Sequence, residues 1–302
     1  MAISETPEKG ESFSAPDSLM PEGSAQQRHT QTVRLVPNRK VEGLGFEELW
    51  AYRELVIGLF HRDIMAIRNQ TPLAWFWRIL APTFPIISYT VLFEHIGKVD
   101  FGQGIPYFFL ISAAMIPWTL ISSIMIGAVN SVVGNASFFQ KVYFPRIILP
   151  IVSVTNTIVD FLLTCLLLLA ILFYMGMPLS TNLFFVPFFG LWALLFGLGC
   201  GLWLSALNVL YRDVGQSLGY LIQIAFFFSP VVYPTEAVPE RFRDLYHLNP
   251  VVGIIDGFRW AFLEQGSPPS ESDFWAFVAT CLLVLSGIWF FRKLEKVFAD
   301  VV

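Results

Sequence analysis

The chain has 302 residues, of which 55% are hydrophobic and only 14% are charged, with a formal net charge of −4. Soluble domains carry about 25% charged residues, so this composition excludes an ordinary soluble protein and indicates a membrane protein. No basic run is dense enough to predict a nucleic-acid partner. The three cysteines lie far apart inside apolar runs, which predicts neither a metal site nor a disulfide framework.

Residues 1–40 differ in kind from the rest of the chain. They are rich in Glu, Ser, Pro and Gln and contain almost no apolar clusters, a composition typical of disordered segments. They also lack the continuous apolar core of a signal peptide. The sequence therefore predicts a disordered cytoplasmic tail over residues 1–40 and a transmembrane domain over residues 41–302.

The segment "FEELWAYRELVIGLF" at residues 46–60 has the pattern of an amphipathic helix. Apolar residues such as Trp50 and Phe60 recur at helical spacing, with Glu47 and Glu54 largely on the opposite face. At about 15 residues the segment is too short to span a bilayer, so we expect an interfacial helix on the cytoplasmic leaflet. The pattern leaves two roles open, a membrane anchor and a docking element for a partner.

Six later segments are long and apolar enough to cross a bilayer as helices, which takes about 20 residues each. Pro82 and Pro85 in the first span, and Pro230 and Pro234 in the fifth, would break a soluble helix. In a membrane bundle, neighbouring helices satisfy the backbone groups that proline frees. We therefore predict an all-α integral membrane protein with six spans, at residues 79–96, 105–133, 147–175, 183–209, 214–234 and 274–291.

The basic residues between the spans predict the orientation, because cytoplasmic connections carry an excess of Lys and Arg. With the N-terminus inside, nine such residues flank the inner ends of the spans and four lie in the outer connections. Both termini are therefore predicted to be cytoplasmic. The inner set is Arg62, Arg68, Arg78, Lys141, Arg146, Arg212, Arg292, Lys293 and Lys296, and the outer set is Lys98, Arg241, Arg243 and Arg259.

The outer connection between the fifth and sixth spans predicts two short helices. Asn249 suits the N-cap and Pro250 the first position of the second helix. That helix, residues 250–264, is about 22 Å long, so we expect it to enter the outer leaflet without crossing it. Such a re-entrant pair suggests a gated path, and Asp256 and Arg259 are spaced to pair across one turn, as gate residues or as a local salt bridge. The candidate outer gate is Asn249, Pro250, Asp256 and Arg259.

The sequence contains none of the motifs of common enzymes. It has no GxxxxGK[ST] phosphate loop, no HExxH and no GxSxG, so we assign no catalytic or metal-binding residue. Intramembrane acids mark functional sites by default, and Asp160 in the third span is the one to test, although pairing with a neighbouring Ser, Thr or Asn is the expected explanation. So few buried ionisable residues argue against an ion-coupled secondary transporter. Acids gathered on the outer side argue against a membrane glycosyltransferase.

Aromatic residues are abundant, with 30 Phe, 9 Trp and 9 Tyr. Most fit an interfacial belt and lipid-facing positions. Aromatic faces also stack on the apolar faces of sugars without trapping them through strong hydrogen bonds. A pathway lined by such rings could conduct a polymer, and the candidate pore residues are Tyr107, Phe108, Phe226 and Phe227.

Several stretches carry a resemblance to a known family. In chain order they are "YRELVIGLFHRDI", "NQTPLAWFWRILAP", "GNASFFQKVYFPRIILP", "GLWLSALNVLYRDV", "SPVVYP", "LNPVVGIIDGFRWAFL" and the final "FADVV". Their order and spacing over residues 46–302 resemble the membrane subunit of type-2 ABC exporters for polysaccharides, the O-antigen and teichoic-acid permeases.

The resemblance implies a permease of the bacterial inner membrane, built as a homodimer of six-span subunits. It implies a separate ABC ATPase subunit that would use ATP and Mg²⁺, so that this chain binds no cofactor and is not itself an enzyme. The implied cargo is a lipid-linked glycan, with O-antigen as the first expectation. Exporters of teichoic acid, capsule, a drug or a small lipid are the alternatives within the same type, and an ion-coupled secondary transporter is a further alternative.

The resemblance also implies roles for residues on the cytoplasmic side. The helix at residues 46–60 and a coupling helix in the loop at residues 135–145 would contact the ATPase. Arg62, Arg68 and Arg78 lie where a lipid diphosphate headgroup would approach, and positive-inside anchoring explains the same arginines. The implied ATPase-coupling residues are Glu47, Trp50, Arg53, Ser137, Phe138, Phe139, Gln140, Lys141, Val142 and Tyr143.

Overall fold

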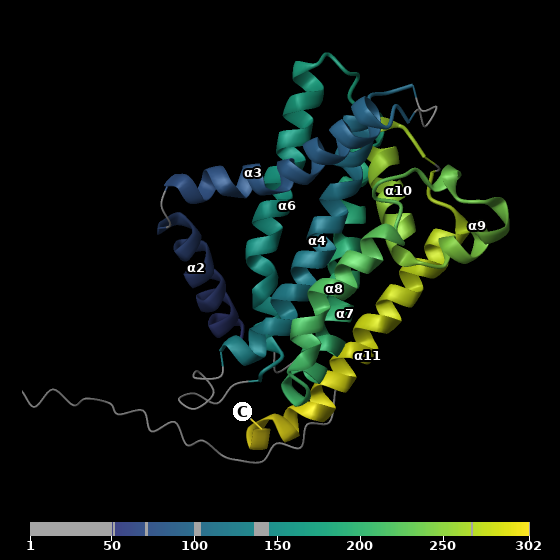
Figure 1. The fold of residues 1–302 in the computed structure, drawn as a ribbon. Helices are drawn as coiled ribbons and strands as arrows, with labels where there is room; N and C mark the ends of the chain where they lie inside the picture. The colour runs from purple at the N-terminus through teal and green to yellow at the C-terminus, as the bar shows by residue number, and fades with distance from the viewer. Residues whose placement is uncertain are drawn as a thin grey trace, which may run out of the picture. The chain divides into compact units, whose positions relative to one another are not determined.

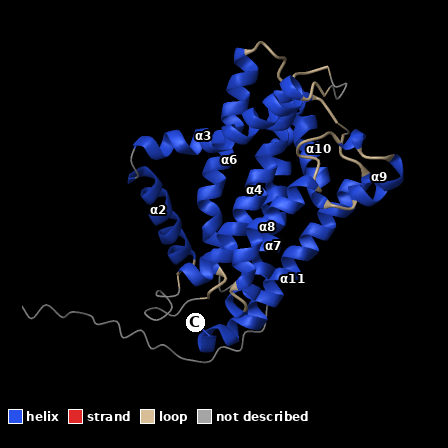
Figure 2. Cartoon of the chain, in the orientation of Figure 1, coloured by secondary structure: helices blue, strands red, loops and turns tan. Residues whose placement is uncertain are grey.

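The computed structural model describes residues 50, 52–69, 72–99, 104–135, 145–266 and 268–301. Every regular element in these ranges is a helix, as Figure 2 shows, which confirms the predicted all-α class. The predicted tail at residues 1–40 lies outside the described residues. The elements are α2 (Arg53–Asn69), α3 (Pro72–Thr90), η1 (Val91–Ile96), α4 (Tyr107–Gly134), α6 (Ile148–Tyr174), η2 (Thr181–Phe185), α7 (Val186–Leu210), α8 (Asp213–Phe227), η3 (Thr235–Ala237), α9 (Glu240–His247), α10 (Pro250–Leu263) and α11 (Glu271–Val301).

Five helices in the described part of the chain are long and apolar enough to cross a membrane. They are α3 with its π-helical extension η1, then α4, α6, α7 with the preceding turn η2, and α11, and they correspond to five of the six predicted spans. Pro82 and Pro85 lie inside α3, as the six-span prediction requires. The helix begins at Pro72, well before the predicted start at residue 79, because proline suits a first turn whose N–H groups have no helical partner.

The remaining predicted span, residues 214–234, corresponds to α8, which is only 15 residues long. A helix of that length measures about 22 Å and is shorter than the roughly 30 Å hydrocarbon core. It ends at Phe227 because Pro230 has no N–H to donate to the carbonyl of Phe226, and because proline disfavours the helical conformation at Ser229. The predicted helix was therefore too long at its C-terminal end.

The predicted interfacial helix also has different bounds. Residues 46–49 lie outside the described residues, and α2 continues to Asn69, past the predicted end at Phe60. The apolar periodicity stops near Phe60, but no proline follows until Pro72, so nothing in the backbone ends the helix there. The apolar face of α2 packs on the first turns of α6, where Leu55 and other α2 residues contact a buried cluster.

α4 is the most deeply buried of the five candidate spans and lies between α6 and α7 (Figure 1). A Cβ atom on Gly201 of α7 would lie 2.7 Å from the Cβ of Ala128 in α4. A Cβ atom on Gly197 would lie 3.1 Å from the carbonyl oxygen of Ile121. The two helices therefore meet almost backbone to backbone, as membrane helices do where small residues line the contact.

α11 runs along α7, and the two helices also approach closely at glycine residues. A Cβ atom on Gly287 would lie 3.1 Å from the carbonyl oxygen of Gly199. Toward the C-terminal end of α11, the rings of Trp203 and Phe290 stack with their centroids 4.0 Å apart. Glycines and stacked rings together fix the position of α11 relative to α7.

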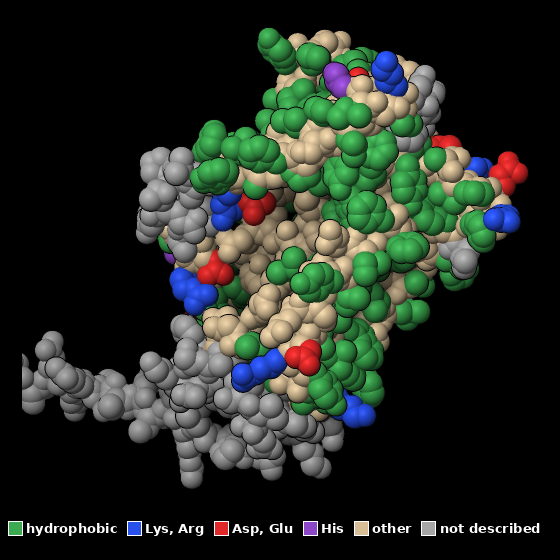
Figure 3. Space-filling model, viewed as in Figure 1, with side chains coloured by type: hydrophobic (Ala, Val, Ile, Leu, Met, Phe, Trp, Pro, Cys, Tyr) green, Lys and Arg blue, Asp and Glu red, His purple; other side chains and the backbone are tan. Residues whose placement is uncertain are grey.

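α3 and α8 expose large apolar side chains. Phe84 and Ile87 of α3 are about half exposed, and Tyr220 and Phe227 of α8 are more exposed still. On the face drawn in Figure 3, hydrophobic side chains cover much of the surface, whereas Lys, Arg, Asp and Glu gather toward its ends and margins. Apolar surface of this extent requires lipid or another protein as its neighbour.

Candidate functional site

Arg259 of α10 is buried, with 2% of its surface exposed, and it binds the irregular segment that follows α8. Its guanidinium donates to the carbonyl oxygens of Val231 at 3.2 Å and Tyr233 at 3.3 Å. It also forms an ion pair with Asp256 at 3.6 Å, which confirms the predicted pairing across one helical turn. The pair is more than a local salt bridge, because the same guanidinium holds backbone from a different part of the chain.

Two further side chains complete this arrangement, which we call the Arg259 clamp. Thr235 donates its hydroxyl to the carboxylate of Asp256 at 2.6 Å, and Tyr107 of α4 donates to the carbonyl oxygen of Val232 at 2.6 Å. Burial raises the pKa of the Asp256 carboxyl and lowers that of Arg259, and the attraction between the two opposes both shifts. The clamp consists of Arg259, Asp256, Thr235 and Tyr107.

The start of α10 is capped as the sequence predicts. The side chain of Asn249 accepts a hydrogen bond from the backbone N–H of Val251 at 3.1 Å, and Pro250 is the first helical residue. Sequence reasoning missed the face that α10 presents to α7. A Cβ atom on Gly257 would lie 2.1 Å from the ring of Phe189, and the G-x-x-x-G spacing of "GIIDG" was the available signal.

The four candidate pore aromatics do not share one environment. Tyr107 and Phe226 are buried in the hydrophobic core, and they are joined by a chain of ring contacts through Phe93 and Tyr89. Phe227 is 57% exposed on α8. The hydroxyl of Tyr107 is engaged in the Arg259 clamp. The fourth, Phe108, is partly buried beside Phe109.

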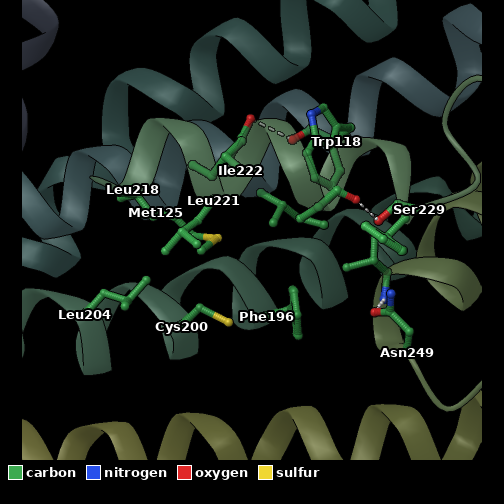
Figure 4. Close-up of a pocket in the computed structure, with 15 residues that line it drawn as sticks. Trp118, Met125, Phe196, Cys200, Leu204, Leu218, Leu221, Ile222, Ser229 and Asn249 are labelled. Atoms are coloured by element: carbon green, nitrogen blue, oxygen red, sulfur yellow. Dashed lines mark hydrogen bonds between the residues drawn. The ribbon is translucent and has the colours of Figure 1, made fainter. Parts of the chain in front are cut away.

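A cavity of about 270 Å³ lies between α8, α4 and α7. Figure 4 shows Ser229 and Asn249 at one end and Leu204 at the other, with apolar side chains between them. No charged residue lines this cavity, so it suits an apolar group rather than an anion or a nucleotide. No local pattern predicts this cavity, because its lining comes from four separate helices, α4, α7, α8 and α10, and from residues beside α8 and α10.

Two of the three candidate headgroup arginines form ion pairs with acids. Arg62 pairs with its neighbour Asp63 at 2.9 Å, and Arg78 of α3 pairs with Asp160 of α6. The prediction that Asp160 pairs with a neighbouring Ser, Thr or Asn was therefore wrong. The third candidate, Arg68, lies at the C-terminal end of α2, and its side chain is outside the described set.

The structure places part of the predicted coupling set. Trp50 is 72% exposed. The guanidinium of Arg53 lies 5.6 Å from the centroid of the Trp50 ring. Glu47 and the predicted coupling residues 137–143 lie outside the described residues. The described chain resumes at Pro145, three residues before α6. Ile148, Leu149 and Val152 of α6 pack against Tyr52, directly before α2, and against Leu55, Val56 and Leu59 of α2.

The sequence profile of a family described as ABC-2 type transporter matches residues 54–263. This range contains four of the five candidate spans, the Arg259 clamp and the contact between α2 and α6. The chain belongs to the ABC-2 type transporter family. Together with the five apolar helices, this membership makes it a multi-pass membrane permease.

Relatives of this ABC-2 transporter align with it over nearly their whole length. The O-antigen export system permease protein RfbA of Myxococcus xanthus is 28% identical over 256 residues, which cover 84% of this chain and 97% of the relative. The protein of the same name from Klebsiella pneumoniae is 24% identical over 249 residues, covering 82% and 95%. The polysialic acid transport protein KpsM of Escherichia coli is 23% identical over 256 residues, covering 83% and 96%.

Several polar side chains in the described part of this ABC-2 transporter link one helix to another. Among the described residues, no three His, Cys, Asp and Glu side chains gather as metal ligands do. The polar contacts instead join helices: the Arg259 clamp joins α10 to α4 and the segment after α8, and Arg78 with Asp160 joins α3 to α6. Such contacts fix the positions of helices or release them, which is what a transport permease requires of its polar residues.

Proposed function

We propose that this chain is the permease subunit of an ATP-driven ABC exporter that moves a lipid-linked polysaccharide, O-antigen, outward across the bacterial inner membrane. The observation that carries the proposal is the alignment with relatives named as O-antigen permeases over 95% and 97% of their own lengths. The KpsM relative is named for polysialic acid transport. All three relatives are thus named for moving a glycan, and glycan export is the activity that these similarities support best.

The proposal includes six membrane crossings with both termini in the cytoplasm. In it, α8 and the irregular residues 228–234 cross the bilayer together as the fifth span. Irregular backbone is tolerated at membrane depth only where protein groups or water satisfy it, and Arg259 and Tyr107 bind three carbonyl groups of this segment. The excess of Lys and Arg on the predicted inner flanks supports the orientation.

The proposal also includes a second copy of the chain. α3 and α8 leave large apolar side chains exposed, including Phe84 on α3 and Tyr220 on α8. Lipid covers part of this surface, and we assign the rest to a symmetric partner, since most homo-oligomers close through a twofold axis. A glycan path then lies between the two copies, where the exposed Phe227 is the best placed of the candidate pore aromatics.

ATP hydrolysis takes place in a separate ATPase subunit under this proposal, because the chain has no phosphate loop. That partner uses ATP and Mg²⁺ and binds the cytoplasmic turn at residues 137–143 together with the exposed end of α2 near Trp50. The packing of α2 on the start of α6 supports this role, because α2 lies against the helix that follows the predicted turn in the sequence. α9 and α10 then close the opposite, outer end of the path.

The candidate headgroup arginines acquire a more specific role. Since Arg78 is paired with Asp160, a diphosphate headgroup must displace this carboxylate to bind the guanidinium. Both side chains are partly exposed, at 18% and 46% respectively, so an anion can reach the pair. The pair would then keep α3 on α6 until the lipid headgroup arrives.

The test is deletion of the gene in its native host, followed by complementation and analysis of surface polysaccharide. O-antigen is expected to disappear from the surface, and lipid-linked glycan is expected to accumulate inside the cell and to return to normal with the wild-type gene. Mass spectrometry of the accumulated glycan separates the candidates. Loss of capsule alone would favour a KpsM-like role, and unchanged surface glycans would exclude polysaccharide export.

A further inference from the structure

The C-terminal helix α11 binds the backbone at the point where the chain leaves the predicted coupling turn. The N–H of Arg146, two residues before α6, donates to the carboxylate of Glu295 at 2.6 Å. Arg146 and Glu295 are 149 positions apart in the sequence. The contact therefore joins two parts of the fold that sequence order keeps separate.

The surroundings of this hydrogen bond are packed. Ile147, directly before α6, is 1% exposed, and Phe291 of α11 is fully buried in the same cluster. That cluster also contains Val132 from the end of α4 and Leu202 and Val209 from α7. The start of α6 is thus enclosed on this side by the ends of three other helices.

The opposite side of the first turns of α6 contacts α2. Ile148, Leu149 and Val152 form a separate buried cluster against the apolar face of α2. The first turns of α6 are consequently held between α2 on one side and α11 with α7 on the other. A displacement at this point acts on both neighbours, because close-packed side chains transmit strain rather than absorb it.

The chemistry of Glu295 suits this position. A carboxylate at the start of a helix is stabilised by N–H groups that have no intrahelical partner and by the helix dipole. Hydrogen bonds to an ionised acceptor are also shorter and stronger than neutral ones. The sequence around it is otherwise basic, with Arg292, Lys293 and Lys296 nearby, so an acid here is not explained by the distribution of charge at the inner flanks.

We propose that Glu295 is a positioning residue that ties α11 to the start of α6, so that a displacement of the start of α6 during ATP hydrolysis in the partner subunit moves α2, α6 and α11 together. This inference rests on the proposed function. It adds α11 to the two helices, α2 and α6, that the proposed function already connects with the ATPase. In this proposal Glu295 acts through the backbone N–H of Arg146.

The test compares Glu295→Gln, Glu295→Asp and Glu295→Ala in the full transporter, reconstituted with its ATPase. The matched control is Glu271→Gln, an exposed acid at the other end of the same helix. The first readout is the amount of glycan exported per ATP hydrolysed. We expect Glu295→Ala to lower this ratio by about tenfold, since a charge-assisted hydrogen bond is lost, with smaller losses for Gln and Asp and none for the control.

A second readout does not depend on the cargo. A spin label at Lys293→Cys, in a background in which Cys165, Cys200 and Cys281 are alanine, reports the motion of α11 when ATP is added. In the protein with Glu295, we expect the spectrum of the label to change when ATP is added. We expect this change to be lost in Glu295→Ala. If the alanine variant does not accumulate in cells, Glu295→Gln takes its place. An unchanged coupling ratio together with an unchanged spectral response would overturn the inference. A wild-type spectral response without any glycan export would instead overturn the proposed function.

Discussion

Arg78 of α3 and Asp160 of α6 form an ion pair between two helices, 82 positions apart in the sequence. Neither residue has a charge partner nearby in sequence, so each is accounted for by the other. An ionisable residue within a membrane-spanning helix is costly unless it is paired. The pairing explains how Asp160 is tolerated in an otherwise apolar helix, and it links the first described span to the third.

A double-mutant cycle with Arg78→Ala and Asp160→Ala tests this contact. We expect a coupling free energy of about 0.5–1.5 kcal/mol, as found for polar contacts between membrane helices. The measurement is thermal unfolding of the purified protein in detergent or nanodiscs. Two single variants whose effects simply add would show that the pair contributes nothing to the contact between α3 and α6.

The Arg259 clamp is expected to be more sensitive, because both of its charges are buried. Asp256→Ala leaves the guanidinium of Arg259 without its counter-ion, and we expect a loss of about 3–5 kcal/mol in unfolding free energy. Thr235→Val is the matched control, since it removes only one hydrogen bond and should lose about 1 kcal/mol. Equal losses in the two variants would contradict the central place given to the ion pair.

The contact between α10 and α7 depends on the absence of a side chain at Gly257. A Cβ atom there would overlap the ring of Phe189, so Gly257→Ala must displace this ring or the helices that meet here, and we expect a loss of about 1–3 kcal/mol in unfolding free energy. Gly219→Ala on α8 is the control, because no atom lies within 4 Å of its added Cβ. Alanine favours a helix over glycine by about 1 kcal/mol, so the control should be neutral or slightly more stable. Thermal unfolding of the two variants decides between these expectations.

The predicted orientation is tested by cysteine accessibility. In a background without native cysteines, Lys141→Cys should be labelled by a membrane-impermeant maleimide only after the cells are opened. Arg241→Cys, at an exposed position on α9, should be labelled in intact spheroplasts. The opposite pattern would mean that the Arg259 clamp and α10 lie on the cytoplasmic side.

Much of the fold follows from local patterns in the sequence. Long apolar runs predicted five of the helices that can cross a membrane, and Asn249 with Pro250 predicted the start of α10, because capping and apolar length depend on neighbouring residues. The end of α8 was missed, although Pro230 was visible, since prolines were expected to be tolerated there as they are at Pro82 and Pro85. A proline is tolerated inside a membrane helix only where groups from other helices bind the backbone carbonyls that it leaves free. No local sequence pattern shows those groups.

The contacts that join distant parts of the chain could not be predicted in the same way. The partners Arg78 and Asp160, and likewise Arg146 and Glu295, are fixed by how helices pack, which no periodicity records. The predicted pairing of Asp256 with Arg259 was correct because both residues lie on one helical turn. Their role in binding the segment after α8 emerged only from the fold.

The most direct test of the account is ATP-dependent export in vesicles that contain this chain, its ATPase and a lipid-linked O-antigen. We predict that glycan becomes accessible on the side opposite the ATPase when ATP and Mg²⁺ are added, and that the chain without its ATPase moves none. Glycan transfer that needs no ATP, or ATP hydrolysis that never moves glycan in the presence of an intact permease, would contradict it.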